Sequence, residues 1–154
     1  MAATEVVQII AWLEAAGVIY QINGGWGVDG LVGRQTRPHH DLDVFIDADH
    51  EATLLAWLTS RGYRVTQDWR PVRVELSSPG GRVDVHPMRM DAAGNGVQEG
   101  LDGEVYVHAA EHRVNGHIDG HAVVVASAQR ARALRSGYPP REVDLHDLAL
   151  LDDL

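Results

Sequence analysis

Two short strand patterns joined by a tight turn constrain the fold of this chain more than any other feature. The segments VRVELS (72–77) and RVDVH (82–86) alternate apolar and polar residues, and SPGG separates them. Such alternation predicts strands, and a short turn rich in proline and glycine predicts a hairpin. Because a parallel crossover needs about a dozen residues or more, these two strands must pair antiparallel. A purely parallel sheet is therefore excluded.

Helix and strand patterns alternate along the rest of the chain. They predict helices at 4–17, 24–33, 49–61 and 127–137 and after 140, and strands at 18–23, 42–47, 63–66, 105–108 and 121–126. Thr4, Asp49 and Ser127 are the expected N-caps of three of these helices. The 154 residues have the length of one ordinary domain. We expect a single domain over 1–154 with an α/β (α+β) fold: a mixed, largely antiparallel sheet flanked by helices.

Charge and composition exclude several classes of protein. The chain carries 13 basic and 22 acidic residues, a formal net charge of −9, which disfavours a surface that follows nucleic-acid phosphates. It has no cysteine, so disulfide frameworks, zinc–thiolate sites and thiol nucleophiles are excluded. Segment 1–17 lacks a basic leader, and no apolar run is long enough to cross a bilayer. We expect a cytoplasmic protein that binds neither nucleic acid nor membrane.

Three aspartates alternate with apolar residues on two of the predicted strands. Asp41 and Asp43 are two residues apart in DLDVFID, so both point to one face while the leucine between them faces the other way. Asp84 is likewise flanked by two valines. Three close carboxylates would raise one another's pKa unless a cation neutralised them. Magnesium suits oxygen ligands and substrate phosphates, and two ions can clamp an in-line phosphoryl displacement. The alternative is a solvated strand end without metal.

A glycine turn precedes the first carboxylate strand. Gly24 and Gly25 lie between a predicted strand and a short helix, where backbone amides and the positive helix end can approach phosphates without interference from a Cβ. Arg34 and Arg37 follow shortly before the acids; they are either solvated loop charges or groups that bind a triphosphate. The turn and the acids together predict a site for a metal-bound nucleotide.

The same glycines allow a competing interpretation. Gly25, Gly27 and Gly30 spell GxGxxG after a strand, and Asp47 lies at a plausible distance for a ribose contact, as in a Rossmann fold. However, the second strand of a Rossmann fold would contain Asp43, where a parallel sheet requires continuous apolar residues. The predicted hairpin also supplies no further βαβ unit. We therefore rank this interpretation below the metal-bound nucleotide.

The nine histidines raise a second alternative, a zinc hydrolase. His39, His40 and His86 lie near the acids in sequence. Most of the histidines are scattered over loops without the spacing of a zinc ligand set. We rank zinc hydrolysis below the magnesium interpretation as well.

The stretch GGWGVDGLVGRQTRPHHDLDVFID resembles the antibiotic nucleotidyltransferases, within the superfamily that pairs a GG or GS turn with DxD and a later carboxylate strand. It is most similar to the small single-domain lincosamide nucleotidyltransferases. These share GGWGVD, RxHxDhD (h is apolar), Arg-x-Glu at 73–75, D-h-H-P at 84–87 and SGY at 136–138. The resemblance is strongest over 24–49, weakest between about 91 and 125, and departs from the family pattern at His40 and at Pro139-Pro140.

The resemblance implies roles for the acids. Asp41 and Asp43 are expected to hold magnesium, with Asp84 as a third metal ligand or as the general base. Glu75 is the alternative base. Two magnesium ions and ATP as co-substrate are the implied cofactors.

The resemblance also places residues around the nucleotide and the acceptor. Those expected around the triphosphate are Gly24, Gly25, Arg37 and His39. Glu75, Tyr106, Asp144 and Asp147 are further candidates for the acceptor or nucleotide pocket. Family members of this size pair as homodimers so that both chains shape the acceptor site, which makes a homodimer the implied assembly.

The function implied by the resemblance is magnesium-dependent transfer of AMP from ATP to a hydroxyl of a small antibiotic, a lincosamide or a similar amino sugar, with release of pyrophosphate. An aminoglycoside is the alternative acceptor. A different class of function is an antitoxin-like nucleotidyltransferase domain that binds or modifies a protein partner. A catalytically silent relative is the third alternative.

Overall fold

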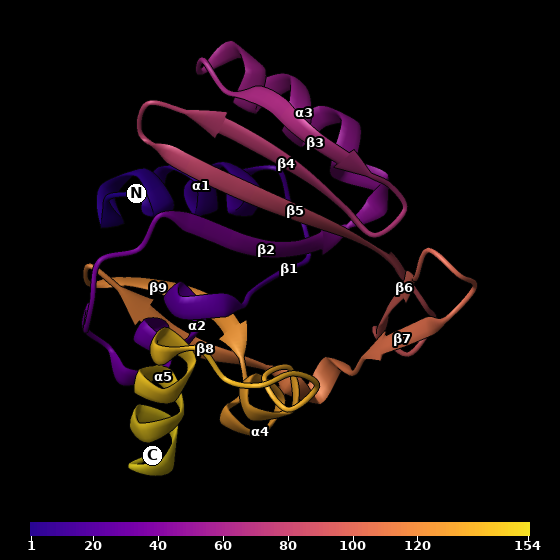
Figure 1. Cartoon of the computed structure of the whole chain (residues 1–154). Helices are drawn as coiled ribbons and strands as arrows, with labels where there is room; N and C mark the ends of the chain where they lie inside the picture. Colours follow the sequence, from indigo (N-terminus) through magenta and orange to yellow (C-terminus); the bar gives the residue numbers. More distant parts are fainter.

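Nine strands and five helices make up the chain, and the structure, a computed structural model, describes residues 1–154 (Figure 1). The helices are α1 (Ala3–Ala15), α2 (Gly24–Val32), α3 (Glu51–Ser60), α4 (Ala128–Ala133) and α5 (Glu142–Asp152), and the 3-10 turns are η1 (Ala48–His50) and η2 (Ala110–His112). The strands are β1 (Tyr20–Ile22), β2 (Asp41–Asp47), β3 (Arg64–Trp69), β4 (Arg73–Ser78), β5 (Gly81–Met90), β6 (Gly96–Glu99), β7 (Val105–His108), β8 (Arg113–Ile118) and β9 (His121–Ala126). None of the helices has both the length and the apolar character that a bilayer crossing requires.

The strands form one mixed sheet in the order β3-β4-β5-β2-β1-β9-β8, and β6 and β7 continue it from the end of β5. The pairs β2–β5 and β1–β9 are parallel, and all other neighbours are antiparallel. Strands β4 and β5 form the predicted hairpin, with Ser78 opposite Gly81. The predicted mixed, largely antiparallel sheet flanked by helices is confirmed.

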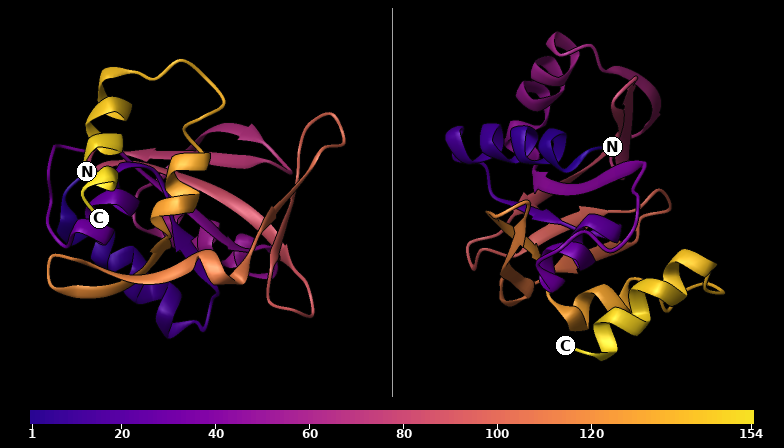
Figure 2. Two further views of the ribbon diagram at one scale, coloured as in Figure 1. Left: turned by 90° about the horizontal axis from the view of Figure 1, so that it is seen from below. Right: turned by 90° about the vertical axis from the view of Figure 1, so that its left-hand side faces the viewer.

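The apolar residues of the two central carboxylate strands face a layer of helices. Leu42 and Val44 on β2 and Val83 and Val85 on β5 are fully buried, as their alternation predicts. They share one core cluster with the buried residues of α1 and α3. Helices α1 and α3 lie on one side of the sheet, and α4 and α5 lie on the other (Figure 2). The polar face of β2 is therefore turned toward the side of α4 and α5.

Helix α2 docks on the sheet through close backbone contact. A Cβ placed on Gly116 of β8 would lie 2.5 Å from the carbonyl oxygen of Gly30, and a Cβ on Gly30 would lie 2.8 Å from a methyl carbon of Val125. The helix ends at Gly33, whose φ of 79° lies in the left-handed region, as predicted. Small residues thus set how closely α2 approaches the sheet, and with it the position of Gly24 at its N-terminus.

Two of the predicted helix caps are wrong. Helix α1 begins at Ala3 and has no side-chain cap, so Thr4 does not start it. Asp49 does not cap α3 either: the Asp47 carboxylate accepts the Asp49 backbone N–H, and η1 precedes the helix. Asp47 ends a strand and already has the non-helical backbone that an N-cap needs, which Asp49 lacks.

The bounds of two other predicted elements differ from the structure, and two strands were not predicted. Ser127 caps α4 as expected, accepting the Arg130 backbone N–H, but the helix ends at Ala133 and not at Gly137. The predicted strand 18–23 is confined to β1. Strand β6 was missed because it has only four residues and begins at Gly96, and β8 was missed because Asn115 and Gly116, which are unfavourable in strands, interrupt its pattern.

The structure excludes the Rossmann interpretation. Gly25, Gly27 and Gly30 lie inside α2. The strand that follows this helix, β2, pairs antiparallel with β1, whereas a βαβ unit requires parallel strands. Asp47, the supposed ribose ligand, caps η1.

We expect Gly116→Ala to destabilise the protein, because the added Cβ meets the backbone of α2 and the helix must shift. The free energy of unfolding should fall by about 1–3 kcal/mol, measured by urea denaturation followed by circular dichroism. Gly137→Ala is the matched control, since a Cβ there meets nothing within 4 Å. Equal stability of the two variants would contradict this packing of α2 against β8.

Candidate active site

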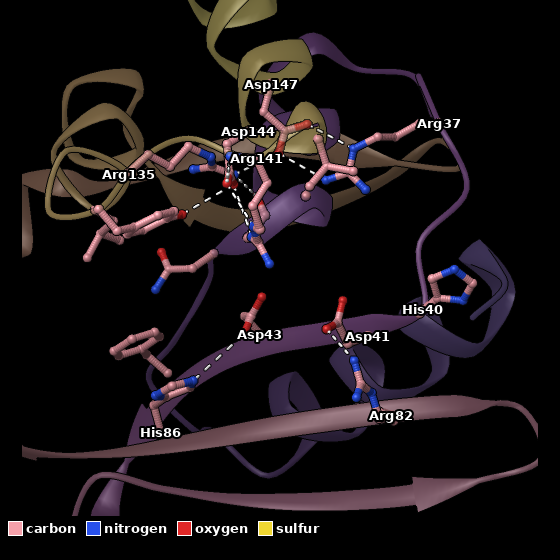
Figure 3. Close-up of a pocket in the computed structure, with 17 residues that line it drawn as sticks. Arg37, His40, Asp41, Asp43, Arg82, His86, Arg135, Arg141, Asp144 and Asp147 are labelled. Carbon is pink, nitrogen blue, oxygen red and sulfur yellow. Dashed lines mark hydrogen bonds and ion pairs between the residues drawn. The ribbon is translucent and has the colours of Figure 1, made fainter.

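A pocket of about 460 Å³ lies between the polar face of β2 and the segment that contains α4 and α5. Asp41 and Asp43 project from β2 on one side, and Arg37, Arg135 and Arg141 lie on the other (Figure 3). Gly24 and Gly25, which form the glycine turn at the start of α2, also line the pocket. Segments far apart in sequence therefore meet around one cavity.

Asp41 and Asp43 form the acid wall of the pocket, and Asp43 begins a row of three carboxylates that runs across three strands. Asp43 on β2 is the register partner of Asp84 on β5, and Asp84 is the partner of Glu75 on β4. Register partners in a sheet place their side chains on the same face. The arrangement brings the predicted third acid beside the DxD strand. The row continues past Asp84 to Glu75, which is 8% exposed.

Arginine and histidine side chains lie between these acids. Arg82 binds the Asp41 carboxylate at 3.0 Å, and His86 Nε2 lies 3.8 Å from Asp43. Arg73 binds Asp84 directly, and its guanidinium is 3.9 Å from Glu75. These pairs offset the repulsion that close carboxylates would otherwise cause.

The surroundings of Asp84 raise its proton affinity. The residue is 5% exposed. Burial, followed by the charge of Asp43, raises the pKa of Asp84 above its ordinary value, although Arg73 and His86 act in the opposite direction. A raised pKa makes a carboxylate a stronger base, which suits proton abstraction.

Two of the three predicted metal ligands line the pocket. The side chains of Asp41 and Asp43 are 39% and 33% exposed, whereas Asp84 is buried against Arg73 and is not part of the pocket wall. No three histidine or acidic side chains converge closely enough to hold a metal by themselves, which also leaves the zinc interpretation without a ligand set. Two carboxylates fit magnesium, which usually binds through one or two of them and completes its shell with phosphates and water.

The glycine turn is packed tightly against both walls. A Cβ on Gly24 would overlap the Asp43 carboxylate, and a Cβ on Gly25 would overlap Arg37 and lie 2.5 Å from His39 Nδ1. Gly24 also has a φ of 61°, a conformation that other residues rarely adopt. No residue with a Cβ fits at either position without displacing its neighbours. The two glycines lie where the sequence predicted a phosphate-binding turn.

Buried hydrogen-bond donors without partners line the same pocket. Asn23, directly before the turn, has a free Nδ2, and Arg135 has a free Nε. These residues are 5% and 7% exposed. A buried donor left without a partner costs roughly 1–3 kcal/mol, so both atoms favour a hydrogen-bond acceptor that a ligand could bring beside them. Phosphate oxygens would satisfy them.

The cationic wall is held by two aspartates of α5. Arg37 and Arg135 both bind Asp147, at 2.9 and 2.8 Å. Arg141 binds Asp144 at 2.8 Å, and its hydrogen bonds lower the pKa of Asp144 to about 2. Asp144 and Asp147, which the resemblance named as pocket candidates, thus lie at the pocket and act on its arginines.

Two other predicted residues lie outside the pocket wall. His39 is 4% exposed, packs on Trp26 and bonds Asp29 at 2.5 Å through Nε2. Burial acts against ionisation of Asp29, but the hydrogen bonds from His39 and Thr36 outweigh it and lower the pKa of Asp29. The neighbouring His40 lines the pocket in its place. Tyr106 lies on β7, away from the site.

Several pocket residues were not identified from the sequence as members of the nucleotide site: Asn23, Phe45, Arg82, His86, Leu134, Arg135, Tyr138, Arg141 and Val143. Asn23 directly precedes the glycine pair, and Phe45 continues the i, i+2 series of the two aspartates, so strand alternation could have found both. For Arg135 and Arg141, which flank the SGY segment, no local pattern pointed to the pocket.

Comparison with known proteins gives consistent results. Residues 5–151 match the model of the aminoglycoside-2''-adenylyltransferase family. A lincosamide resistance protein from Staphylococcus haemolyticus is 30% identical over 97% of this chain and 94% of its own length. A 2''-aminoglycoside nucleotidyltransferase from Klebsiella pneumoniae is 34% identical over 65 residues, which are 42% of this chain and 37% of that protein.

Solved structures show the same relationship. The crystal structure of the lincosamide antibiotic adenylyltransferase LnuA, bound to lincomycin, superposes with a TM-score of 0.91 at 30% identity, covering 99% of this chain and 97% of that one. The antibiotic-resistance factor ANT(2'')-Ia shares the fold, with a TM-score of 0.76 at 19% identity over 98% of this chain and 82% of that one. The chain therefore belongs to the aminoglycoside-2''-adenylyltransferase family of nucleotidyltransferase enzymes.

Proposed function

We propose that this enzyme transfers AMP from ATP to a hydroxyl group of a lincosamide and releases pyrophosphate, with magnesium as cofactor. The observation that carries the proposal is the pair of exposed carboxylates, Asp41 and Asp43, facing a wall of arginines across a single pocket. The full-length similarity to a lincosamide resistance protein supports the choice of acceptor.

The triphosphate binds at the glycine turn in this proposal. The unpartnered donors of Asn23 and Arg135, together with Arg37, would bind phosphate oxygens, and the first-turn amides of α2 would add N–H groups that no helical carbonyl uses. Asp41 and Asp43 would hold magnesium, which when bound neutralises phosphate charge and polarises the phosphoryl group. The chain's own contribution is mainly to position the reactants and to stabilise charge.

His39 takes an indirect role in the proposal. Its Nε2 bonds the Asp29 carboxylate, and its ring lies against Gly25. It would therefore hold the glycine turn in place and not contact phosphate itself.

Asp84 is the proposed base that accepts the proton of the acceptor hydroxyl. It lies beside Asp43 in register, and burial raises its pKa. Its carboxylate must leave Arg73 at least in part to do so. Glu75, the alternative base, lies one strand further from Asp43, and Thr66 donates a hydrogen bond to it at 2.6 Å.

An aminoglycoside is the second candidate acceptor, because the matching family model describes an aminoglycoside adenylyltransferase. The relative that acts on aminoglycosides matches less than half of the chain, whereas the lincosamide resistance protein matches nearly all of it. This difference in coverage ranks the lincosamide first. A protein acceptor and a homodimeric assembly have no specific support from the pocket.

The proposed reaction predicts a gain of one AMP on lincomycin or clindamycin after incubation with the enzyme, magnesium and ATP. Intact mass spectrometry of the antibiotic measures it, with several aminoglycosides assayed in parallel. Asp43→Asn should reduce transfer by at least about 100-fold because it removes one metal-binding carboxylate. Asp102→Asn, in an exposed loop, is the matched control and should retain full activity.

The outcomes separate the candidate acceptors. AMP on an aminoglycoside alone would move the acceptor to the second candidate. No product on any antibiotic, together with magnesium-dependent ATP binding, would favour a protein or another metabolite as acceptor. Full transfer by Asp43→Asn would refute the metal assignment.

The two candidate bases make opposite predictions. Asp84→Asn should lower kcat by about 10²- to 10⁴-fold, the usual contribution of a general base, whereas Glu75→Gln should cost much less. Steady-state kinetics at saturating ATP measure both, and circular dichroism confirms that each variant is folded. A larger loss for Glu75→Gln would assign the base to Glu75.

A further inference from the structure

Asp147 binds two of the arginines that line the pocket at the same time. It lies on α5 and is 2% exposed. Its Oδ1 accepts a hydrogen bond from Arg37 Nε at 2.9 Å, and its Oδ2 accepts from Arg37 Nη2 at 3.0 Å and from Arg135 Nη2 at 2.8 Å. One carboxylate near the C-terminus thus fixes two guanidinium groups that line the nucleotide pocket.

Arg135 carries this connection to the glycine turn. Besides Asp147, its Nη2 donates to the carbonyl oxygen of Gly24 at 3.0 Å, and its Nη1 donates to Ala131 at 3.0 Å. In a planar trans peptide the N–H points opposite to the C=O. The bond to the Gly24 carbonyl therefore sets the direction in which the Gly25 N–H points.

The charges make Asp147 difficult to replace. Arg135 is nearly buried, and the carboxylate of Asp147 is its only ion-pair partner. Asp147 is also the sole ion-pair partner of Arg37. Without this carboxylate, two neighbouring cations would repel each other, and a buried guanidinium without a counter-charge is costly. Both side chains would then lose the orientation they have in the pocket.

We propose that Asp147 is a positioning residue for the nucleotide: through Arg37 and Arg135 it aligns the cationic groups and the Gly24–Gly25 peptide that bind the phosphates. The inference rests on the nucleotide site of the proposed function and deepens it. It links the docking of the C-terminal helix to ATP binding. The same ion pairs could have the opposite effect. Asp147 would then compete with phosphate for the two arginines, and its removal would strengthen ATP binding.

Titration calorimetry with magnesium and ATP, without any acceptor, tests the proposal. Asp147→Asn should bind ATP about 10- to 100-fold more weakly than the wild type, the range found when a partner that orients a binding group is removed. The matched control is Asp152→Asn, on the same helix, which removes the same charge from an exposed pair with Arg132 at 3.3 Å. Its affinity should stay within about twofold of the wild type.

A second variant covers the case in which Asp147→Asn fails to fold. Arg135→Lys keeps the positive charge, but an ammonium group cannot reproduce the planar set of bonds to Asp147, Gly24 and Ala131. It should weaken ATP binding while the melting temperature stays within a few degrees of the wild type. In turnover assays both variants should raise KM for ATP more than KM for the acceptor, a difference that a general loss of stability would not produce.

The results discriminate between three conclusions. Unchanged or tighter ATP binding by folded Asp147→Asn or Arg135→Lys overturns the positioning role and leaves the proposed function intact. Weaker binding by Asp152→Asn to the same degree shows an effect of helix charge alone and also overturns it. A wild-type protein that binds no ATP with magnesium overturns the nucleotide site itself, and the positioning role with it.

Discussion

The parallel pairing of β2 with β5 is the constraint on which the site depends. Asp43 meets Asp84 in this register, and every odd-numbered residue from 41 to 45 faces the pocket while Leu42 and Val44 enter the core. A shift of one residue along either strand would turn carboxylates into the core and apolar residues into the pocket. The buried leucine and valine side chains therefore fix the position of the acids as firmly as any polar contact does. One strand register therefore places the apolar residues in the core under α1 and α3 and the acids on the opposite face of the sheet.

Four arginines and four aspartates line the pocket, in a chain whose net charge is −9. Arg37, Arg82, Arg135 and Arg141 line it, and each is held by an aspartate. An arginine that is already paired keeps its orientation and loses less conformational entropy when a phosphate arrives. In the proposed complex the carboxylates hold the metal ion and the arginines bind the phosphates of one ligand, a metal-bound triphosphate.

The resemblance identified from the sequence was strongest where the structure builds the pocket. The segment 24–49 supplies the glycine turn, Arg37 and the two exposed aspartates, whereas no residue between 91 and 125, where the resemblance was weakest, lines the pocket. Strands β6 and β8, which were missed, belong to that same weak stretch. Acceptor specificity is harder to place, since His40 and the segment around Pro139-Pro140 depart from the family pattern. The pocket includes His40 and the residues on both sides of these prolines.

The sequence by itself determined the sheet type, the core faces of β2 and β5, the hairpin and the glycine turn, because each follows from periodicity or from the backbone freedom of a few adjacent residues. It also placed Asp41 and Asp43 on one face. Only the tertiary structure decided that Asp84 lies against Arg73, that His39 lies behind the pocket wall, and that Arg135 bonds the carbonyl of Gly24. That last bond joins residues 111 positions apart, and the pairing of Arg37 with Asp147 spans 110. Such contacts depend on where α5 docks, and docking is set by the packing of whole elements, which local patterns along the chain do not encode.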